Sequence, residues 1–259
     1  MPLHITNVEP HVTLITIDNP AKMNAMSRAM MAELADAWDE LDRSDCRAVV
    51  ITGTGERAFC AGADLSGDLS ASEETARMVN RALLKDVVFT KPIIAAVNGT
   101  CAGGGVELML STDIRIASNA ARFGLPEVRW SVYPFGGATV KLTEQIGFVH
   151  AMDLLLTGDF LEAPRAAEIG LVNQAVPEAL LDETVGELAA KLARKSAHAL
   201  ALGKQAFYRQ LEMGITDAFA FAGAEMARNM MDRDAAEGID AFIEKRDPKW
   251  DQGPRQEED

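Results

Sequence analysis

The sequence is poor in cysteine, has no long hydrophobic run and carries no excess of basic charge. Its three cysteines, Cys46, Cys60 and Cys101, are an odd number without C-x-x-C spacing. This argues against a disulfide framework or a structural zinc site and favours a reducing, cytoplasmic location. No stretch approaches the ~18 apolar residues of a membrane span, and the first residues lack the pattern of a signal peptide. We therefore expect an unprocessed, soluble protein with no membrane contact.

The charge balance disfavours nucleic acid as a partner. The chain has 25 Lys and Arg residues against 39 Asp and Glu residues, and its net charge of −14 repels a phosphate backbone because no basic stretch offsets it. Apolar residues make up 48% and charged residues 25%, which is the usual composition of a soluble globular protein. A length of 259 residues suits one large domain, alone or with an appendage.

Several common catalytic motifs are missing. The sequence has no P-loop, no G-x-S-x-G elbow and no H-E-x-x-H helix. A metal centre or a hydrolase triad is also disfavoured, because the four histidines lie far apart and beside no clustered Asp or Cys: His4, His11, His150 and His198. Residues 53–58 (GTGERA) loosely match a dinucleotide fingerprint, but no helical periodicity follows and the motif does not succeed the first strand. We expect neither a metal nor a nicotinamide cofactor.

Strands and helices alternate in the first half of the sequence. Apolar, partly β-branched runs predict strands at residues 12–17, 48–52, 92–97 and 114–117. Capping residues and helical periodicity predict helices after Ser27, from Ser70 to about Phe89, and at residues 103–111. Residues 136–245 favour successive helices, separated by Gly147, Gly158, Gly170 and Gly203.

This order predicts an α/β core at residues 1–195 and a C-terminal helical domain at residues 196–259. The last helices carry several large apolar side chains, namely Phe219, Phe221, Met226, Met230 and Met231. These side chains suit either packing against the core or contacts between subunits, and the sequence does not decide between the two.

Two segments of small residues each follow a buried strand: residues 60–64 (CAGAD) and 103–105 (GGG). Glycine and alanine let another molecule approach the main chain, and the first N–H groups of a helix are unpaired donors with partial positive charge. Two such donors could converge on one oxygen atom. Tight packing of helix against strand explains the glycines equally well.

Two glutamates adjoin these segments. Glu107 lies in the first turn of the predicted helix at residues 103–111, and Glu127 follows Pro126 beyond the strand at 114–117. Taken singly, Glu107 suits the dipole of a helix start and Glu127 suits a solvated loop. Their joint position beside the two small-residue segments favours a functional role over these separate interpretations.

Five blocks, in this order, resemble the crotonase (enoyl-CoA hydratase/isomerase) superfamily: residues 19–26 (NPAKMNAM), 57–65 (RAFCAGADL), 94–99 (IAAVNG), 103–107 (GGGVE) with Asp113, and 123–127 (FGLPE). The resemblance spans almost the whole chain. It implies a core of repeated ββα units with a C-terminal helical domain that mediates assembly into trimers or hexamers. It also implies an acyl-coenzyme A thioester as the substrate, with no separate cofactor.

The resemblance also implies roles for individual residues. The N–H groups of Ala63 and Gly104 would form an oxyanion hole for the thioester carbonyl. Glu107 would hold and activate a water molecule, and Glu127 would give and take the proton at C2. The resemblance further implies contacts with coenzyme A from Lys22, Arg57, Ala61, Asp64, Leu65, Phe242 and Lys245, of which Phe242 and Lys245 would reach the ligand of a neighbouring subunit.

The segment after Glu127 departs from the family pattern, which has glycine at the positions of Ser131, Phe135 and Ala138. Phe135, with Trp130 and Tyr133, would shorten or redirect the acyl pocket, unless these aromatic side chains face the core. Both glutamates are present, so we predict an enoyl-CoA hydratase. The alternatives are a Δ3–Δ2 enoyl-CoA isomerase, another acyl-CoA-transforming crotonase, and a non-catalytic acyl-CoA-binding protein.

Overall fold

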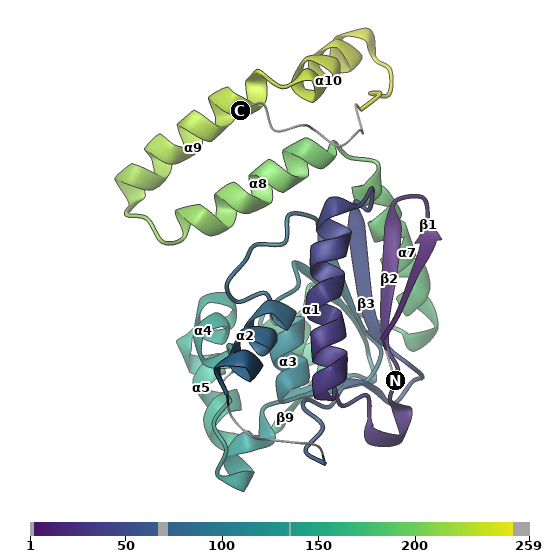
Figure 1. Cartoon of the computed structure of the whole chain (residues 1–259), viewed down its shortest axis with the longest axis vertical. Coiled ribbons are helices and arrows are strands. Elements are labelled where there is room, and N and C mark those ends of the chain that lie inside the picture. The colour runs from purple at the N-terminus through teal and green to yellow at the C-terminus, as the bar shows by residue number, and fades with distance from the viewer. Residues whose placement is uncertain (1–2, 67–71, 135, 251–259) are drawn as a thin grey trace.

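The computed structural model describes residues 3–66, 72–134 and 136–250. The chain forms a layered α/β core, from which three helices extend at one end (Figure 1). Within the described ranges, no helix is both long and apolar enough to cross a membrane.

The main sheet has six strands, in the order β1-β2-β3-β5-β7-β10. Strands β1 and β2 pair in antiparallel fashion, and the remaining neighbours are parallel. Val50 pairs with Ile94, and Ile94 pairs with Ile114, so the middle strands lie in close register. The bounds are β1 (Leu3–Glu9), β2 (Val12–Ile17), β3 (Ala48–Gly53), β5 (Ile93–Val97), β7 (Ile114–Ser118) and β10 (Gln174–Val176).

Helices cover both faces of this sheet. Ile51 points to the face covered by α1 (Arg28–Arg43), whereas Val50 and Ile94 point to the face covered by α7 (Leu181–Ala193). Because successive side chains of a strand alternate between faces, a sheet buried on both sides needs continuous apolar runs. This explains the strand sequence AVVIT at residues 48–52.

A second sheet of four short strands has the order β4-β6-β8-β9. Each of β4, β6 and β8 follows a strand of the main sheet and is itself followed by a helix. This succession of two strands and a helix is the repeated ββα unit. The strands are β4 (Ala58–Cys60), β6 (Thr100–Ala102), β8 (Arg122–Gly124) and β9 (Phe160–Glu162), and the helices that follow the first two units are α2 (Glu73–Ala82) and α3 (Gly104–Met109). The α/β class and the core of repeated ββα units predicted from the sequence are confirmed.

The remaining elements are η1 (Pro20–Lys22), η2 (Pro126–Trp130), α4 (Ala138–Ile146), α5 (Phe148–Thr157), α6 (Ala163–Glu168), η3 (Glu178–Leu180), α8 (Ala197–Gln210), α9 (Ile215–Met230) and α10 (Arg233–Glu244). Figure 1 shows α8, α9 and α10 beyond the end of the core. Lys204 of α8 holds this region to the core, since its Nζ donates to Asp113 Oδ2 (2.7 Å) and to the Lys91 carbonyl (2.8 Å). The boundary predicted after residue 195 directly precedes Ser196, which caps α8, but the division into two domains stays a prediction.

Some predicted elements were wrong. Residues 136–245 are not purely helical, because the three-residue strands β9 and β10 interrupt them, and strands so short show no periodicity. Gly203 lies inside α8 rather than between helices. Helix α2 begins at Glu73 and ends at Ala82, and Ser72 caps it by accepting from the Thr75 N–H; Ser70 lies outside the described residues.

The apolar side chains near the C-terminus do not pack against the core. Phe219, Met226, Met230 and Met231 are exposed, and no side chain of α9 is fully buried. Of the two interpretations left open by the sequence, packing against the core is therefore wrong for these four residues.

Candidate active site

The segment that carries Ala63 is fixed by main-chain hydrogen bonds to residues 23–26. The Ala61 N–H donates to the Met23 carbonyl (3.0 Å), the Met26 N–H donates to the Gly62 carbonyl (2.8 Å), and the Asp64 N–H donates to the Met26 carbonyl (2.9 Å). This pattern is a parallel bridge between Met26 and Ala63. Ala63 lies between the two residues that bond to Met26, Gly62 and Asp64, so its own N–H points away from residues 23–26.

The start of α3 lies against this segment. A Cβ atom placed on Gly104 would lie 3.4 Å from Gly62 Cα and 3.6 Å from the Ala63 nitrogen, so the two main chains are in contact. Gly105 permits this approach, because a Cβ there would lie 2.0 Å from the Cys60 carbonyl oxygen. Neither the Ala63 N–H nor the Gly104 N–H donates a hydrogen bond within the described residues. The structure thus brings two available donors together.

Glu107 is buried one turn into α3. Its Oε1 accepts a hydrogen bond from the Ala138 N–H (3.2 Å) at the start of α4. A Cβ atom placed on Gly136 would lie 2.0 Å from Glu107 Oε2, so glycine at this position leaves room for the carboxyl group. Burial raises the pKa of Glu107; the Ala138 hydrogen bond opposes this shift, and the negative charge of Glu127 adds to it.

Glu127 lies in the first turn of η2, with its carboxyl group against Gly103. A Cβ on Gly103, which has a φ of 55°, would lie 3.0 Å from Glu127 Oε1. Glu127 Oε2 is buried and has no hydrogen-bond partner among the described atoms. Burial raises the pKa of Glu127 as well. The two carboxyl groups therefore adjoin the start of α3 and interact with each other electrostatically.

Four of the residues predicted to contact coenzyme A lie close to Ala63 in the chain or in space. Lys22 Nζ donates to Asp64 Oδ2 (2.7 Å), and this hydrogen bond, with further ones from Ser66, lowers the pKa of Asp64 to about 2. Ala61 and Leu65 belong to the same segment, and the Leu65 side chain is exposed.

The other three predicted coenzyme A contacts are more scattered. Arg57 is exposed in the turn between β3 and β4. Phe242 lies on α10 and Lys245 directly after it; both are exposed, and Figure 1 shows α10 at the far end of the helical region, apart from α3. A single chain therefore does not bring Phe242 and Lys245 to the glutamates.

The aromatic residues after Glu127 do not face the core. Trp130 is 77% exposed and Tyr133 is 66% exposed, so the alternative of a core position is wrong for both. The third predicted pocket residue, Phe135, lies outside the described residues. Ser131 has a φ of 56°, in the left-handed region that favours glycine, which agrees with the glycine that the family has there.

Sequence reasoning missed two groups that hold Glu107. Gly136 provides the space for its carboxyl group, and the Ala138 N–H binds it. The sequence signal for these groups was the start of a helix directly after two glycines. The first N–H groups of a helix are unpaired and can bind a carboxylate oxygen.

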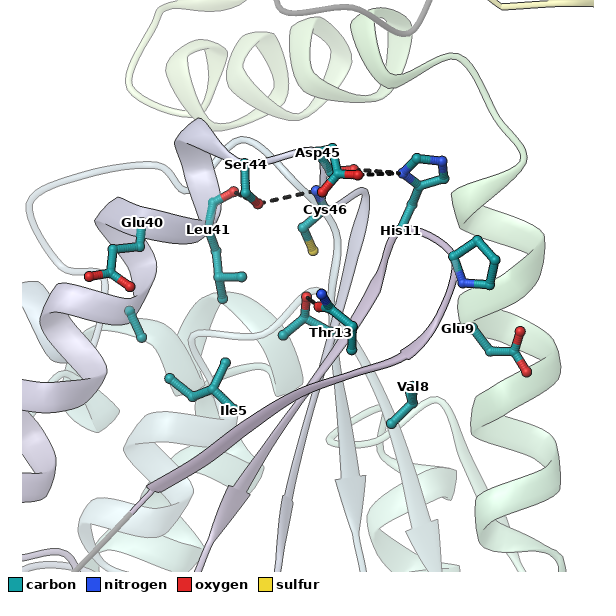
Figure 2. Close-up of a pocket in the computed structure, with 13 residues that line it drawn as sticks. Ile5, Val8, Glu9, His11, Thr13, Glu40, Leu41, Ser44, Asp45 and Cys46 are labelled. Carbon is teal, nitrogen blue, oxygen red and sulfur yellow. Dashed lines mark hydrogen bonds and ion pairs between the residues drawn. The ribbon is translucent and has the colours of Figure 1, made fainter.

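Two hollows lie elsewhere on the surface. One, of about 670 Å³, lies between the β1–β2 turn and the end of α1. Figure 2 shows it with the His11 ring hydrogen-bonded to the main-chain oxygen of Asp45 (2.9 Å) and the Cys46 N–H to Ser44 Oγ (3.1 Å). The other, of about 1430 Å³, lies beneath α8 and is lined by Lys141 and Lys204 among others. Neither includes Glu107 or Glu127.

Available main-chain donors beside two carboxyl groups that are shielded from solvent wholly or in part are typical of enzymes that stabilise negative charge on a carbonyl oxygen while protons are transferred. No three His, Cys, Asp or Glu side chains across residues 3–66, 72–134 and 136–250 are grouped so as to hold a metal ion.

Comparison with known proteins identifies the family. The family model described as Enoyl-CoA hydratase/isomerase matches residues 7–254. The chain is 37% identical to "Enoyl-CoA hydratase EchA19" of Mycobacterium tuberculosis, covering 93% of each chain, and 36% identical to "Short-chain-enoyl-CoA hydratase" of Clostridium acetobutylicum, covering 93% of this chain and 95% of that one. A crystal structure of enoyl-CoA hydratase from Bacillus anthracis superposes with a TM-score of 0.91 at 33% identity, covering 97% of this chain and 99% of the other. The chain belongs to the enoyl-CoA hydratase/isomerase family.

Proposed function

We propose that this protein is an enoyl-CoA hydratase that reversibly adds water to a 2-trans-enoyl-CoA to give the 3-hydroxyacyl-CoA. The observation that carries the proposal is the placement of buried Glu107 and partly buried Glu127 at the start of α3, beside two main-chain donors that are unpaired within the described residues. Relatives named enoyl-CoA hydratase support the same activity.

The donors address the main energetic difficulty of the reaction. Attack of water at C3 of a conjugated thioester places developing negative charge on the carbonyl oxygen. The N–H groups of Ala63 and Gly104 would donate hydrogen bonds to this oxygen. Removal of one such donor typically raises the activation free energy by about 2.7–4 kcal/mol. Because the donors belong to the main chain, they need no reorientation during the reaction.

The glutamates would handle water and protons. Glu107 holds the water and accepts a proton from it, and Glu127 supplies the proton to C2. Burial raises the pKa of both carboxyl groups, and the negative charge of Glu127 raises the pKa of Glu107 further, so the neutral form of each is favoured relative to a solvent-exposed glutamate. The two groups titrate as a coupled unit.

Coenzyme A would lie along residues 57–65. Lys22 and Arg57 would counter its phosphates, and Ala61, Asp64 and Leu65 would line its path. The ion pair with Asp64 offsets the charge of Lys22 before the substrate binds, so we expect the phosphates to compete with Asp64 for Lys22. Trp130, Tyr133 and Phe135 would border the acyl group.

A homotrimer or homohexamer would complete this site. Phe242 and Lys245 are exposed near the end of α10 and directly after it, and α9 carries exposed apolar side chains. A neighbouring subunit would cover this surface and receive Phe242 and Lys245 at its own ligand. We propose a cytoplasmic protein that needs no cofactor beyond the coenzyme A of its substrate.

An isomerase is the second candidate, because it also needs a proton shuttle at C2. It does not need a second carboxyl group to hold water, and the burial of Glu107 with its Ala138 hydrogen bond favours hydration. Conjugated enoyl-CoA substrates with short, medium and aromatic acyl groups test the proposal through the loss of enoyl-thioester absorbance. A protein that hydrates none of them, but converts a 3-enoyl-CoA to the conjugated isomer, would be an isomerase.

A further inference from the structure

The direction of the Ala63 N–H depends on a neighbouring loop that contributes no atom to the proposed chemistry. Residues 23–26 hold residues 61–64 through three main-chain hydrogen bonds of 2.8–3.0 Å. Any movement of residues 23–26 therefore moves the Ala63 N–H with it.

Asn24 fixes this loop from within. Its side chain is buried, and its Nδ2 donates to the carbonyls of Ala58 (2.7 Å) and Thr54 (3.0 Å), while its Oδ1 accepts from the Asn19 N–H (3.0 Å). Gly53 makes room for these contacts, since a Cβ there would lie 2.6 Å from Asn24 Nδ2. One side chain thus joins the loop at 19–26 to the turn that leads into β4.

Asn98 holds the same turn through a second set of hydrogen bonds. Its Nδ2 donates to the carbonyls of Gly53 (2.8 Å) and Ala58 (3.2 Å), and its Oδ1 accepts from the Gly53 N–H (3.2 Å). Asn24 and Asn98 therefore share the Ala58 carbonyl as an acceptor. Because Ala58 begins β4, which leads directly to the Ala63 segment, both ends of the Gly53–Ala58 turn are tied down.

We propose that Asn24, supported by Asn98, is a positioning residue that aims the Ala63 N–H at the substrate's carbonyl oxygen. The inference rests on the proposed function, because only an acyl thioester gives that N–H a carbonyl oxygen to bind. Stabilisation of developing charge depends steeply on donor geometry, and a displacement of about 1 Å can cost ~100-fold in rate. A loop that is merely stabilised would not show this dependence.

The test uses two variants and a matched control in the full-length protein. Asn24→Gly removes the side chain but tolerates the left-handed backbone of Asn24, whose φ is 57°. Asn98→Ala removes the second set of hydrogen bonds. Asn173→Gly is the control, because Asn173 Oδ1 also accepts a main-chain N–H, that of Arg115 (2.8 Å), but in the α6–β10 connection.

With crotonyl-CoA as substrate, we expect kcat to fall ~100-fold in Asn24→Gly and ~10-fold in Asn98→Ala, with KM changed less than about 3-fold. The control should lose some stability and keep its kcat. Equal kcat values in the two test variants and the control would overturn the proposal.

A second measurement does not need turnover. Butyryl-CoA labelled with ¹³C at the thioester carbonyl cannot be hydrated, and hydrogen bonds to the carbonyl oxygen lower its stretching frequency in the infrared spectrum. We expect the wild type to lower this frequency relative to water and both test variants to lose most of the shift while still binding the ligand. A wild type that binds without a shift would contradict the oxyanion hole and hence the proposed function. A shift that persists in the variants would contradict only the positioning role, and failure of both variants to fold would assign the two asparagines to stability alone.

Discussion

The division of labour between Glu107 and Glu127 is open to a direct test. Replacing either residue by glutamine keeps the size of the side chain, and in Glu107→Gln an amide oxygen remains to accept the Ala138 N–H. The structure therefore predicts little loss of folding or ligand binding. General acid–base catalysis by a positioned carboxyl group contributes about 10²–10⁴-fold, so we expect kcat for hydration to fall by that factor in each variant, or about 2.7–5.5 kcal/mol in activation free energy.

The roles differ in a second reaction, the exchange of C2 protons. A saturated acyl-CoA such as butyryl-CoA has no double bond to hydrate, but its C2 protons can exchange with deuterium through an enolate held by the main-chain donors. Only Glu127 is needed for this step. We expect Glu107→Gln to keep the exchange in deuterated water within about 10-fold, and Glu127→Gln to lose it; mass spectrometry of the recovered butyryl-CoA measures both.

The matched control is Glu144→Gln, which changes an exposed carboxyl group on α4. It should leave hydration and exchange unchanged. If Glu107→Gln abolished exchange while Glu127→Gln retained it, the assignment of the two roles would be reversed. If either glutamine variant hydrated crotonyl-CoA at the wild-type rate, its glutamate would have no catalytic role.

Three further predictions concern stability. Burial raises the pKa of Glu107 in the folded state above its ordinary value of 4.5. The stability that Glu107 contributes is therefore present at low pH and is lost as the pH rises through the folded-state pKa. Glu107→Gln should raise Tm at pH 8, with a smaller gain at pH 5, in thermal scans. Lys204→Met removes one partner of a partly buried ion pair and should lower the free energy of unfolding by about 2 kcal/mol in denaturant titrations. Lys191→Met, at an exposed position of α7, should change it by less than about 0.5 kcal/mol. Gly105→Ala places a Cβ against the Cys60 carbonyl and should lower the free energy of unfolding by about 3 kcal/mol or more. Gly186→Ala, in an open part of α7, should raise it by about 0.5–1 kcal/mol. Equal effects of the two glycine variants would contradict the packing described for α3.

The parts of the fold that could be predicted are those with strong local signals. Strands β2, β3, β5 and β7 are apolar runs, and α1 begins where Ser27 accepts a hydrogen bond from the Met30 N–H, as the capping residue predicted. Strand β1 was missed because six of its seven side chains are exposed and show no alternation. Strands β9 and β10 exist only through pairing with distant strands, which no local pattern reveals.

The candidate site divides in the same way. The two glycine-rich segments and both glutamates stand out in the sequence, because their residue types are distinctive and lie next to strand ends. The setting of Glu107 does not, since the Ala138 N–H that binds it is 31 residues away and arrives only when α4 packs beside α3. The role of Asn24 is hidden for a similar reason: its acceptors, Thr54 and Ala58, are 30 and 34 residues further along the chain.

Because the proposed oxygen-binding donors are backbone atoms, the side chain at position 63 can change while the N–H group that stabilises the charge remains. Natural variation there can reshape the neighbourhood of the acyl group without erasing the chemistry. The opposite holds at Gly62, whose φ is 101° and where an added Cβ would lie only 3.0 Å from the Gly104 nitrogen, so any other residue would be strained there. A saturation scan scored by turnover would therefore register the supporting glycine as indispensable and the donor-bearing alanine as replaceable.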